Sequence, residues 1–217
     1  MIGVAVSTHQ RPQILSEALQ NWDRYQAPGC SFHVVEDVSG AGVAITKNRG
    51  IAALMDDGVE HLFLVDDDCW PKAEGWWLPY VEDPMPHLMY CWGGSRRIRK
   101  EGRYSYWTHP RGVMLYLHRS VIETVGGMRT EFGRKGHEHV EYSRRIHNAG
   151  FTPEPFMDLR ISGDVWHALD RRQPGESLSA LGDRRKSLQT VGNSPDTRHL
   201  LDIYKDSAEF VEYHVQT

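Results

Sequence analysis

The stretch His61-Leu-Phe-Leu-Val-Asp-Asp-Asp-Cys-Trp-Pro71 decides the fold prediction, because a short apolar run there ends in three consecutive carboxylates. The run over residues 62–65 is typical of a strand that is covered on both faces of a sheet. Asp66, Asp67 and Asp68 would then lie at its carboxyl end, which is the ligand-binding edge of an open α/β sheet. Three like charges repel one another unless a cation offsets them, and Mg²⁺ or Mn²⁺ prefers such oxygens. A solvated acidic turn is the alternative, and the triplet alone does not decide between the two.

The composition is that of an ordinary globular protein. The 217 residues are enough for one sizeable core. The formal charge of −4 argues against a protein that coats nucleic acid through its overall field, although a local basic groove stays open. Neither a signal-peptide core nor a run of membrane-spanning length is found, so we expect a cytoplasmic protein. Cys30, Cys69 and Cys91 have unrelated spacings, which favours reduced thiols over disulfides or a zinc site.

Strands and helices alternate in the part of the chain before residue 72. Apolar residues recur at helical spacing after each of the first two apolar strand-like runs. The predicted elements are strands over residues 2–6, 32–35 and 62–65 and helices over residues 12–27 and 45–55. This order predicts parallel strands with right-handed crossovers, as in a doubly wound half-domain. Polar residues would therefore gather at one edge of the sheet, namely Thr8, His9, Arg11, Glu36, Asp37 and the aspartate triplet.

The pattern changes to shorter elements beyond Pro71. A stretch rich in basic and aromatic residues, 96–107, is typical of a hairpin or loop. Two predicted helices are stopped by glycines, at Gly126 and at Gly150. The elements expected here are strands over residues 88–92, 113–117 and 157–162 and helices over residues 119–125, 137–149 and 200–210.

Several short motifs follow one another along the chain. Those of the first half are residues 4–12 (VAVSTHQRP), 34–37 (VVED), 47–51 (KNRGI) and 63–71 (FLVDDDCWP). Those of the second half are residues 112–119 (GVMLYLHR), 125–128 (VGGM), 136–145 (GHEHVEYSRR) and 165–167 (VWH). Each motif alone is weak, but over residues 2–172 their order and spacing resemble the GT-A family of nucleotide-sugar glycosyltransferases, in particular its family-2-like and polypeptide-GalNAc-transferase-like members.

The resemblance implies the fold class and the division of the chain. We expect an α/β protein with the GT-A, Rossmann-like mixed sheet flanked by helices, in a single domain. Residues 1–172 would form the catalytic domain, with a nucleotide-sugar-binding half over 1–95 and an acceptor-side half over 96–172. Residues 173–217 would form a C-terminal extension packed on that domain.

The resemblance also implies a donor site and a metal site. The residues expected to bind the nucleotide sugar, most readily a UDP-sugar, are Thr8, His9, Arg11, Asp37, Lys47, Arg49, Asp66, Asp67 and Gly112. The expected ligands of Mn²⁺ or Mg²⁺ are Asp66, Asp68 and His167. A sugar diphosphate leaves as an anion, which a divalent ion and a neighbouring lysine or arginine would stabilise. The alternative for His167 is a core histidine beside Trp166.

The candidate catalytic residues are Glu138 and His139, at the start of the predicted helix behind Gly136. Inverting family-2 enzymes have an aspartate as general base where this chain has His139. A histidine could act as that base near neutral pH, Glu138 could replace it, or the enzyme could retain the anomeric configuration. All three stay open at the level of sequence.

The acceptor side is expected to involve Arg96, Arg97, Arg99, Tyr106 and Trp107. Clustered basic and aromatic side chains are typical of nucleic-acid contacts, so one hypothesis is DNA that carries hydroxymethylated bases, as in some bacteriophages. The protein would then act in the host cytoplasm. A solvated hairpin is the alternative, and a glycan or protein acceptor also fits a transferase.

Two other functions compete with the transferase. Another metal-dependent enzyme of phosphodiester chemistry would use the aspartate triplet equally well, but it would have no need for the glycine-rich strand and the GHEH segment. A nucleotide-sugar or glycan-binding module with an inactive site is the rival outside enzymes. Donor hydrolysis separates these classes, because a transferase usually transfers some sugar to water.

Overall fold

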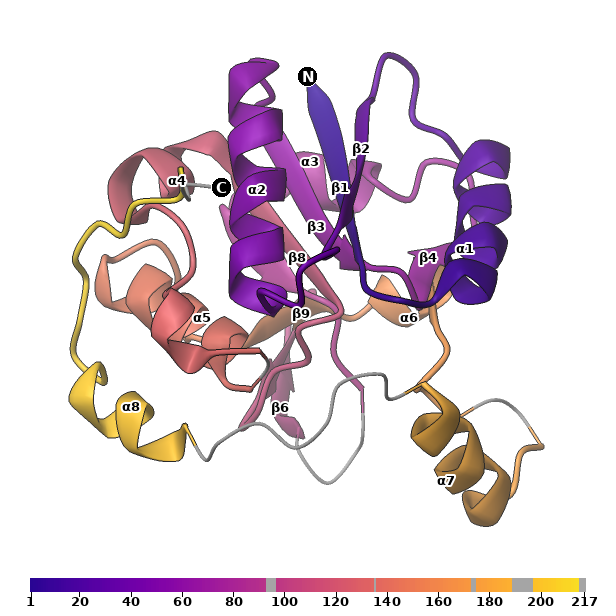
Figure 1. Ribbon diagram of the computed structural model, residues 1–217. Coiled ribbons are helices and arrows are strands. Elements are labelled where there is room, and N and C mark those ends of the chain that lie inside the picture. Colours follow the sequence, from indigo (N-terminus) through magenta and orange to yellow (C-terminus); the bar gives the residue numbers. More distant parts are fainter. Residues whose placement is uncertain (93–96, 135, 173–174, 189–196, 215–217) are drawn as a thin grey trace.

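The computed structural model describes residues 1–92, 97–134, 136–172, 175–188 and 197–214 (Figure 1). Within these residues, five strands form the central sheet in the order β2-β1-β3-β8-β5. Their bounds are β1 Ile2–Thr8, β2 Ser31–Glu36, β3 His61–Asp66, β5 His87–Met89 and β8 Met114–His118. Strand β1 pairs parallel with β2 and with β3, whereas β8 runs antiparallel to β3 and to β5. The predicted parallel pairing of the first three long strands and the predicted mixed sheet are confirmed.

Both faces of this sheet are covered, which explains the continuous apolar run of β3. Phe63 and Val65 face the cluster that contains Trp22 of α1, Pro12–Arg24. The alternate residues of β3, Leu62 and Leu64, face the cluster built on α2, Val43–Asp56, which lies in front of β1 and β3 in Figure 1. Because successive side chains of a strand point to opposite faces, a strand between two helical layers has no solvent side.

Smaller antiparallel sheets lie beside the central one in the described part of the chain. Strand β4, Cys69–Pro71, pairs with β10, Trp166–Ala168. The basic and aromatic stretch forms the hairpin of β6, Arg97–Glu101, and β7, Tyr104–Trp107, and β7 also pairs with β9, Met157–Leu159. The strand predicted over residues 157–162 is therefore too long, because the short helix α6 begins at Ser162.

The remaining helices are short. Their bounds are α3 Leu78–Val81, α4 Arg119–Val125, the 3₁₀ helix η2 Thr130–Phe132, α5 Glu138–Asn148, α6 Ser162–Val165, α7 Leu178–Ser187 and α8 Arg198–Ile203. Helix α7 was not predicted, although Ser177 caps it by accepting a hydrogen bond from the amide of Ala180 at 3.1 Å. No helix in the described residues is long and apolar enough to cross a membrane.

The predicted helix over residues 200–210 is wrong beyond Ile203. The side-chain amide of Asn148 donates to the carbonyl oxygens of Lys205 and Ser207, at 3.0 and 2.9 Å, and so holds the chain in a turn. The segment that follows forms a parallel bridge between Val211 and Gly126, at the end of α4. Backbone groups that would have continued the helix are paired with α4 and α5 instead.

A buried charged network lies under α5. Glu141 and Arg145 are 1% and 0% exposed, and the Nε of Arg145 lies 2.8 Å from Oε1 of Glu141. Arg129 donates to the same carboxylate at 3.2 Å. These residues connect α5 to the segment before η2 and to Glu209, so their role is structural.

Candidate active site

The carboxyl ends of the parallel strands meet at one edge of the sheet, as the sequence predicted. The hydroxyl of Thr8, at the end of β1, donates to Oδ2 of Asp67 at 2.6 Å. The amide of Asp37 donates to the carbonyl of Thr8 at 2.9 Å and so joins the end of β2 to the same point. Residues from separate strands therefore form one continuous edge.

Arg11 binds two members of the aspartate triplet. It lies just before α1, and its Nε donates to Oδ2 of Asp67 while its Nη1 donates to Oδ2 of Asp68, both at 3.2 Å. Its Nη2 also contacts Oδ1 of Asp67. Asp67 is fully buried and both of its oxygens have partners. Asp67 therefore shapes the turn, and the outer aspartates face the site.

Lys47 links α2 to the end of β3. Its ammonium donates to Oδ1 of Asp66 at 2.7 Å and to the carbonyl of Gly112 at 3.1 Å, while the residue is only 1% exposed. Gly112 is packed closely, because a Cβ there would lie 2.9 Å from the ring of His139. A buried cation is thus shared between the acidic edge and the segment that approaches α5.

The turn after β2 is organised by Asp37. Its carboxylate accepts hydrogen bonds from the amides of Ala41 and Gly42, at 2.7 and 2.9 Å. The Nδ1 of His9 lies 2.7 Å from the carbonyl of Asp37. Arg49 lies nearly two helical turns from the start of α2, and its buried Nε has no hydrogen-bond partner among the described residues.

Glu138 and His139 form a pair at the start of α5. The Nδ1 of His139 lies 2.9 Å from Oε1 of Glu138, and the amide of Gly136 donates to Oε2 at 2.8 Å. Burial acts to raise the pKa of Glu138, but the neighbouring His139 and the backbone donors lower it to about 2. Glu138 is therefore ionised at neutral pH and orients the imidazole. The left-handed backbone of His137, with φ of 69°, sets this arrangement.

Asp68 keeps one oxygen without a partner. Its Oδ1 is buried and makes no hydrogen bond within the described residues. Burial and the charge of Asp66 raise the pKa of Asp68 to about 7, although Arg11 opposes the shift. A buried carboxylate oxygen without a donor is costly, so this oxygen suits a cation or a proton as its partner.

Asp170 is a carboxylate of this region that the sequence did not identify. The amide of Leu169 donates to the carbonyl of Asp68 at 2.9 Å, which brings the segment after β10 alongside the triplet. The Oδ1 of Asp170 is also buried without a partner in the described part of the chain. Burial raises the pKa of Asp170, against the charge of Arg111, and Asp66 adds to the shift. The only sequence signal was its position three residues after His167.

His167 is not grouped with the outer aspartates. It pairs across the strands with Trp70, and the two rings stack with centroids 4.8 Å apart. Burial lowers the pKa of His167, and neighbouring lysine and arginine charges lower it further. Within the described residues no three His, Cys, Asp or Glu side chains are close enough together to hold a metal ion. The assignment of His167 as a ligand stays a prediction.

The acceptor-side residues occupy the β6-β7 hairpin, except Arg96, which lies outside the described residues. The guanidinium of Arg99 lies 3.9 Å from the ring centre of Tyr106 and also pairs with Glu101 and Glu154. Arg97 lies 5.9 Å from the ring centre of Trp107. Both aromatic residues are only 6% exposed. The hairpin therefore offers an arginine surface, and its rings serve mainly as packing.

Solved structures agree with the fold. The chain is similar to the mannosyltransferase PcManGT from Pyrobaculum calidifontis in complex with GDP-Man and Mn²⁺, at 13% identity and a TM-score of 0.50, over 94% of this chain and 68% of that one. It is also similar, at 13% identity and a TM-score of 0.38, to a glycosyltransferase involved in the glycosylation of the major capsid of PBCV-1, over 71% of this chain and 72% of that one. No protein-family model and no curated protein matches the sequence. The resemblance to the GT-A glycosyltransferases is confirmed at the level of the fold.

Proposed function

We propose that the protein is a metal-dependent glycosyltransferase that moves a sugar from a nucleotide-sugar donor to an acceptor hydroxyl. The observation that carries the proposal is the edge formed by Lys47, Asp66 and Asp68 at the carboxyl ends of the parallel strands. A buried cation beside carboxylates with a free oxygen suits a diphosphate that is bridged by a divalent ion.

The outer aspartates fit such an ion. Carboxylate oxygens are the ligands that Mg²⁺ and Mn²⁺ prefer, and Asp68 has an oxygen with no other partner in the described residues. Asp66 and Asp68 would hold the ion, with Asp170, whose charge also raises the pKa of Asp68, as a further candidate carboxylate. His167 is the less suitable third ligand because cations surround it. When bound, the ion would supply positive charge to the leaving diphosphate.

The protein's own groups would complete the donor site. Thr8, Asp37 and Arg11 line the nucleotide end of the edge, and Lys47 stands where it could neutralise the diphosphate. We expect a UDP-sugar. The mannosyltransferase with the similar fold holds GDP-Man and Mn²⁺, which supports a nucleotide diphosphate donor in general and makes GDP-mannose the first alternative.

His139 is the general base that the geometry favours. Both oxygens of Glu138 are engaged, and a carboxylate with a pKa of about 2 is a weak base. His139 is held by that carboxylate and lies beside Gly112, whose carbonyl binds Lys47. A base at this position would remove the proton of the acceptor hydroxyl and lead to inversion, which NMR of the product checks.

Calorimetry tests the proposal without knowledge of the acceptor. UDP and GDP should bind in the presence of Mn²⁺, and Asp68→Asn should weaken the binding by about tenfold or more, since one charged contact is worth roughly one decade. Asp183→Asn, on exposed α7, is the matched control. A wild-type protein that binds neither nucleotide with Mn²⁺ would contradict the proposal.

A further inference from the structure

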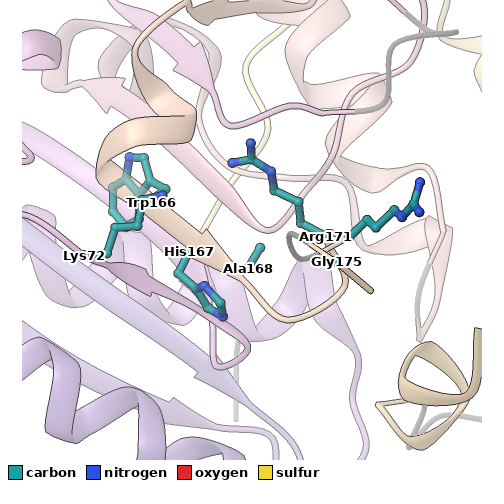
Figure 2. Close-up of a pocket in the computed structure, with 7 residues that line it drawn as sticks. Lys72, Trp166, His167, Ala168, Arg171 and Gly175 are labelled. Carbon is teal, nitrogen blue, oxygen red and sulfur yellow. The ribbon is translucent and has the colours of Figure 1, made fainter. Parts of the chain in front are cut away.

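A basic pocket lies next to the acidic edge, at strands β4 and β10. A pocket of about 420 Å³ is lined by Lys72, Trp166, His167, Ala168, Arg171, Arg172 and Gly175 (Figure 2). Pockets that hold small ligands start at about 300 Å³, so it has room for an anionic group and part of the molecule that carries it. Among the described residues that line it, none is a carboxylate.

The cations of this pocket are supplied by two separate segments. Lys72 directly follows β4, while Arg171 and Arg172 follow β10, which Figure 2 shows beside the pocket. Arg171 is fixed in place, because its Nη1 donates to the hydroxyl of Tyr90 at 2.5 Å and to the carbonyl of Gly163 at 3.2 Å. In the described part of the chain no ion pair engages Lys72. The two carboxylates that flank the arginines in sequence, Asp170 and Glu176, pair with other arginines, Arg111 at 3.5 Å and Arg184 at 2.6 Å.

We propose that this pocket binds a terminal phosphate group on the acceptor. A phosphate accepts several charge-assisted hydrogen bonds at once, and arginine with lysine is the side-chain set that supplies them. Lys72, Arg171 and Arg172 all line one pocket, which suits an end group better than a nucleic-acid backbone. The role as acceptor site rests on the proposed transferase function.

This pocket is distinct from the donor edge but lies next to it. None of Thr8, Asp37, Lys47 and Asp66 lines it. Cys69, the residue after Asp68, pairs across the strands with Ala168 of the pocket. A group bound here would lie a short distance from the acidic edge, where the rest of the acceptor could reach the donor sugar.

Calorimetric titration with inorganic phosphate tests the pocket directly. The wild-type protein should bind phosphate, and the double variant Lys72→Gln/Arg172→Gln should bind it at least about tenfold more weakly, because both side chains are exposed and their loss should leave the fold intact. Arg24→Gln/Lys205→Gln removes the same charge from exposed positions elsewhere and should bind as the wild type does. Equal losses in both double variants, or no phosphate binding by the wild type, would overturn the proposal.

Competition experiments distinguish the source of the phosphate. Phosphate and glucose 6-phosphate should still bind when UDP or GDP is already bound with Mn²⁺. Displacement of phosphate by the nucleotide would assign the pocket to the donor's diphosphate and overturn the proposal. The proposal would also be overturned if an oligonucleotide without a terminal phosphate bound more weakly to Lys72→Gln/Arg172→Gln than to the wild type. If phosphate binds but neither nucleotide does, the proposed function fails while the anion pocket itself stands.

Discussion

Lys47 and Asp66 form a partly buried ion pair, with the ammonium 2.7 Å from Oδ1 of the carboxylate. The pair joins the first turns of α2 to the end of β3 at the edge of the sheet. Asp66 keeps 28% of its side chain exposed, whereas Lys47 is almost fully enclosed. The pair therefore has a protected cation and an open carboxylate, which is the arrangement that an anionic donor with a divalent ion requires.

Replacing Lys47 by methionine should weaken both the fold and nucleotide binding. Asp66 can hydrate when its partner is lost, so we expect the free energy of unfolding to fall by about 1–2 kcal/mol, less than for a fully enclosed pair. The affinity for UDP or GDP with Mn²⁺ should fall by about tenfold. Urea unfolding and calorimetry measure the two effects. An unchanged nucleotide affinity would remove Lys47 from the donor site.

The carboxyl of Asp68 should make metal binding depend on pH. Its pKa is raised from 3.8 to about 7 in the folded protein. Between these two pH values, the folded protein therefore holds a proton that the unfolded chain has released. Without metal, stability should therefore fall as pH rises from about 4 to about 7. Mn²⁺ competes with that proton, so its affinity should rise over the same range.

Asp68→Asn checks this assignment. The variant should lose most of the pH dependence of Mn²⁺ affinity, measured by electron paramagnetic resonance. Its metal-free form should be more stable than the wild type at pH 7 by about 1 kcal/mol or more, since one pKa unit corresponds to roughly that amount. A wild-type Mn²⁺ affinity that is flat between pH 5 and 8 would contradict the role of Asp68.

Glu138→Gln should reduce stability in a pH-dependent way. The pKa of Glu138 is lowered to about 2, so its contribution is present above the ordinary value of 4.5 and is lost as pH falls toward 2. The difference in the free energy of unfolding between wild type and Glu138→Gln should therefore be largest near neutral pH and should shrink below about pH 4.5. A difference that stays constant down to pH 3 would mean that Glu138 is not held as an ion.

His139→Ala should slow transfer without loss of donor affinity. Loss of a general base costs about 10²–10⁴ in rate, while the nucleotide is bound by other residues. His109→Ala, on the loop before Gly112, is a control of the same residue type. Transfer by His139→Ala at more than half the wild-type rate would place the base elsewhere and reopen the retaining mechanism.

The hairpin gives a separate test of the DNA hypothesis. Because Tyr106 and Trp107 are buried, we expect Arg97 and Lys100 to provide backbone contacts only. Arg97→Ser/Lys100→Ser should reduce the slope of oligonucleotide affinity against salt by about two. Affinity should be equal for cytosine and hydroxymethylcytosine. A clear preference for the modified base would show that bases are read and would favour the DNA acceptor.

The sequence predicted the sheet better than the second half of the site. The apolar run before Asp66 identified β3, because a strand that is covered on both faces is apolar at every position and stands out in the sequence. Strands β4 and β10 were missed because three residues carry no periodicity, and with them the position of Asp170 was missed. The separation of His167 from the acidic edge depends on stacking with Trp70, a contact made through cross-strand pairing that spacing along the chain does not encode.

The most direct test of the account is release of sugar from nucleotide-sugar donors in the absence of an acceptor. The wild-type protein should release sugar from a UDP-sugar or from GDP-mannose when Mn²⁺ is present, and EDTA should stop the release. Asp68→Asn, folded by circular dichroism, should reduce it by about a hundredfold or more, while Asp183→Asn should not. Sugar release that is equally fast in Asp68→Asn, or absent with every donor in the wild type, would contradict the glycosyltransferase assignment.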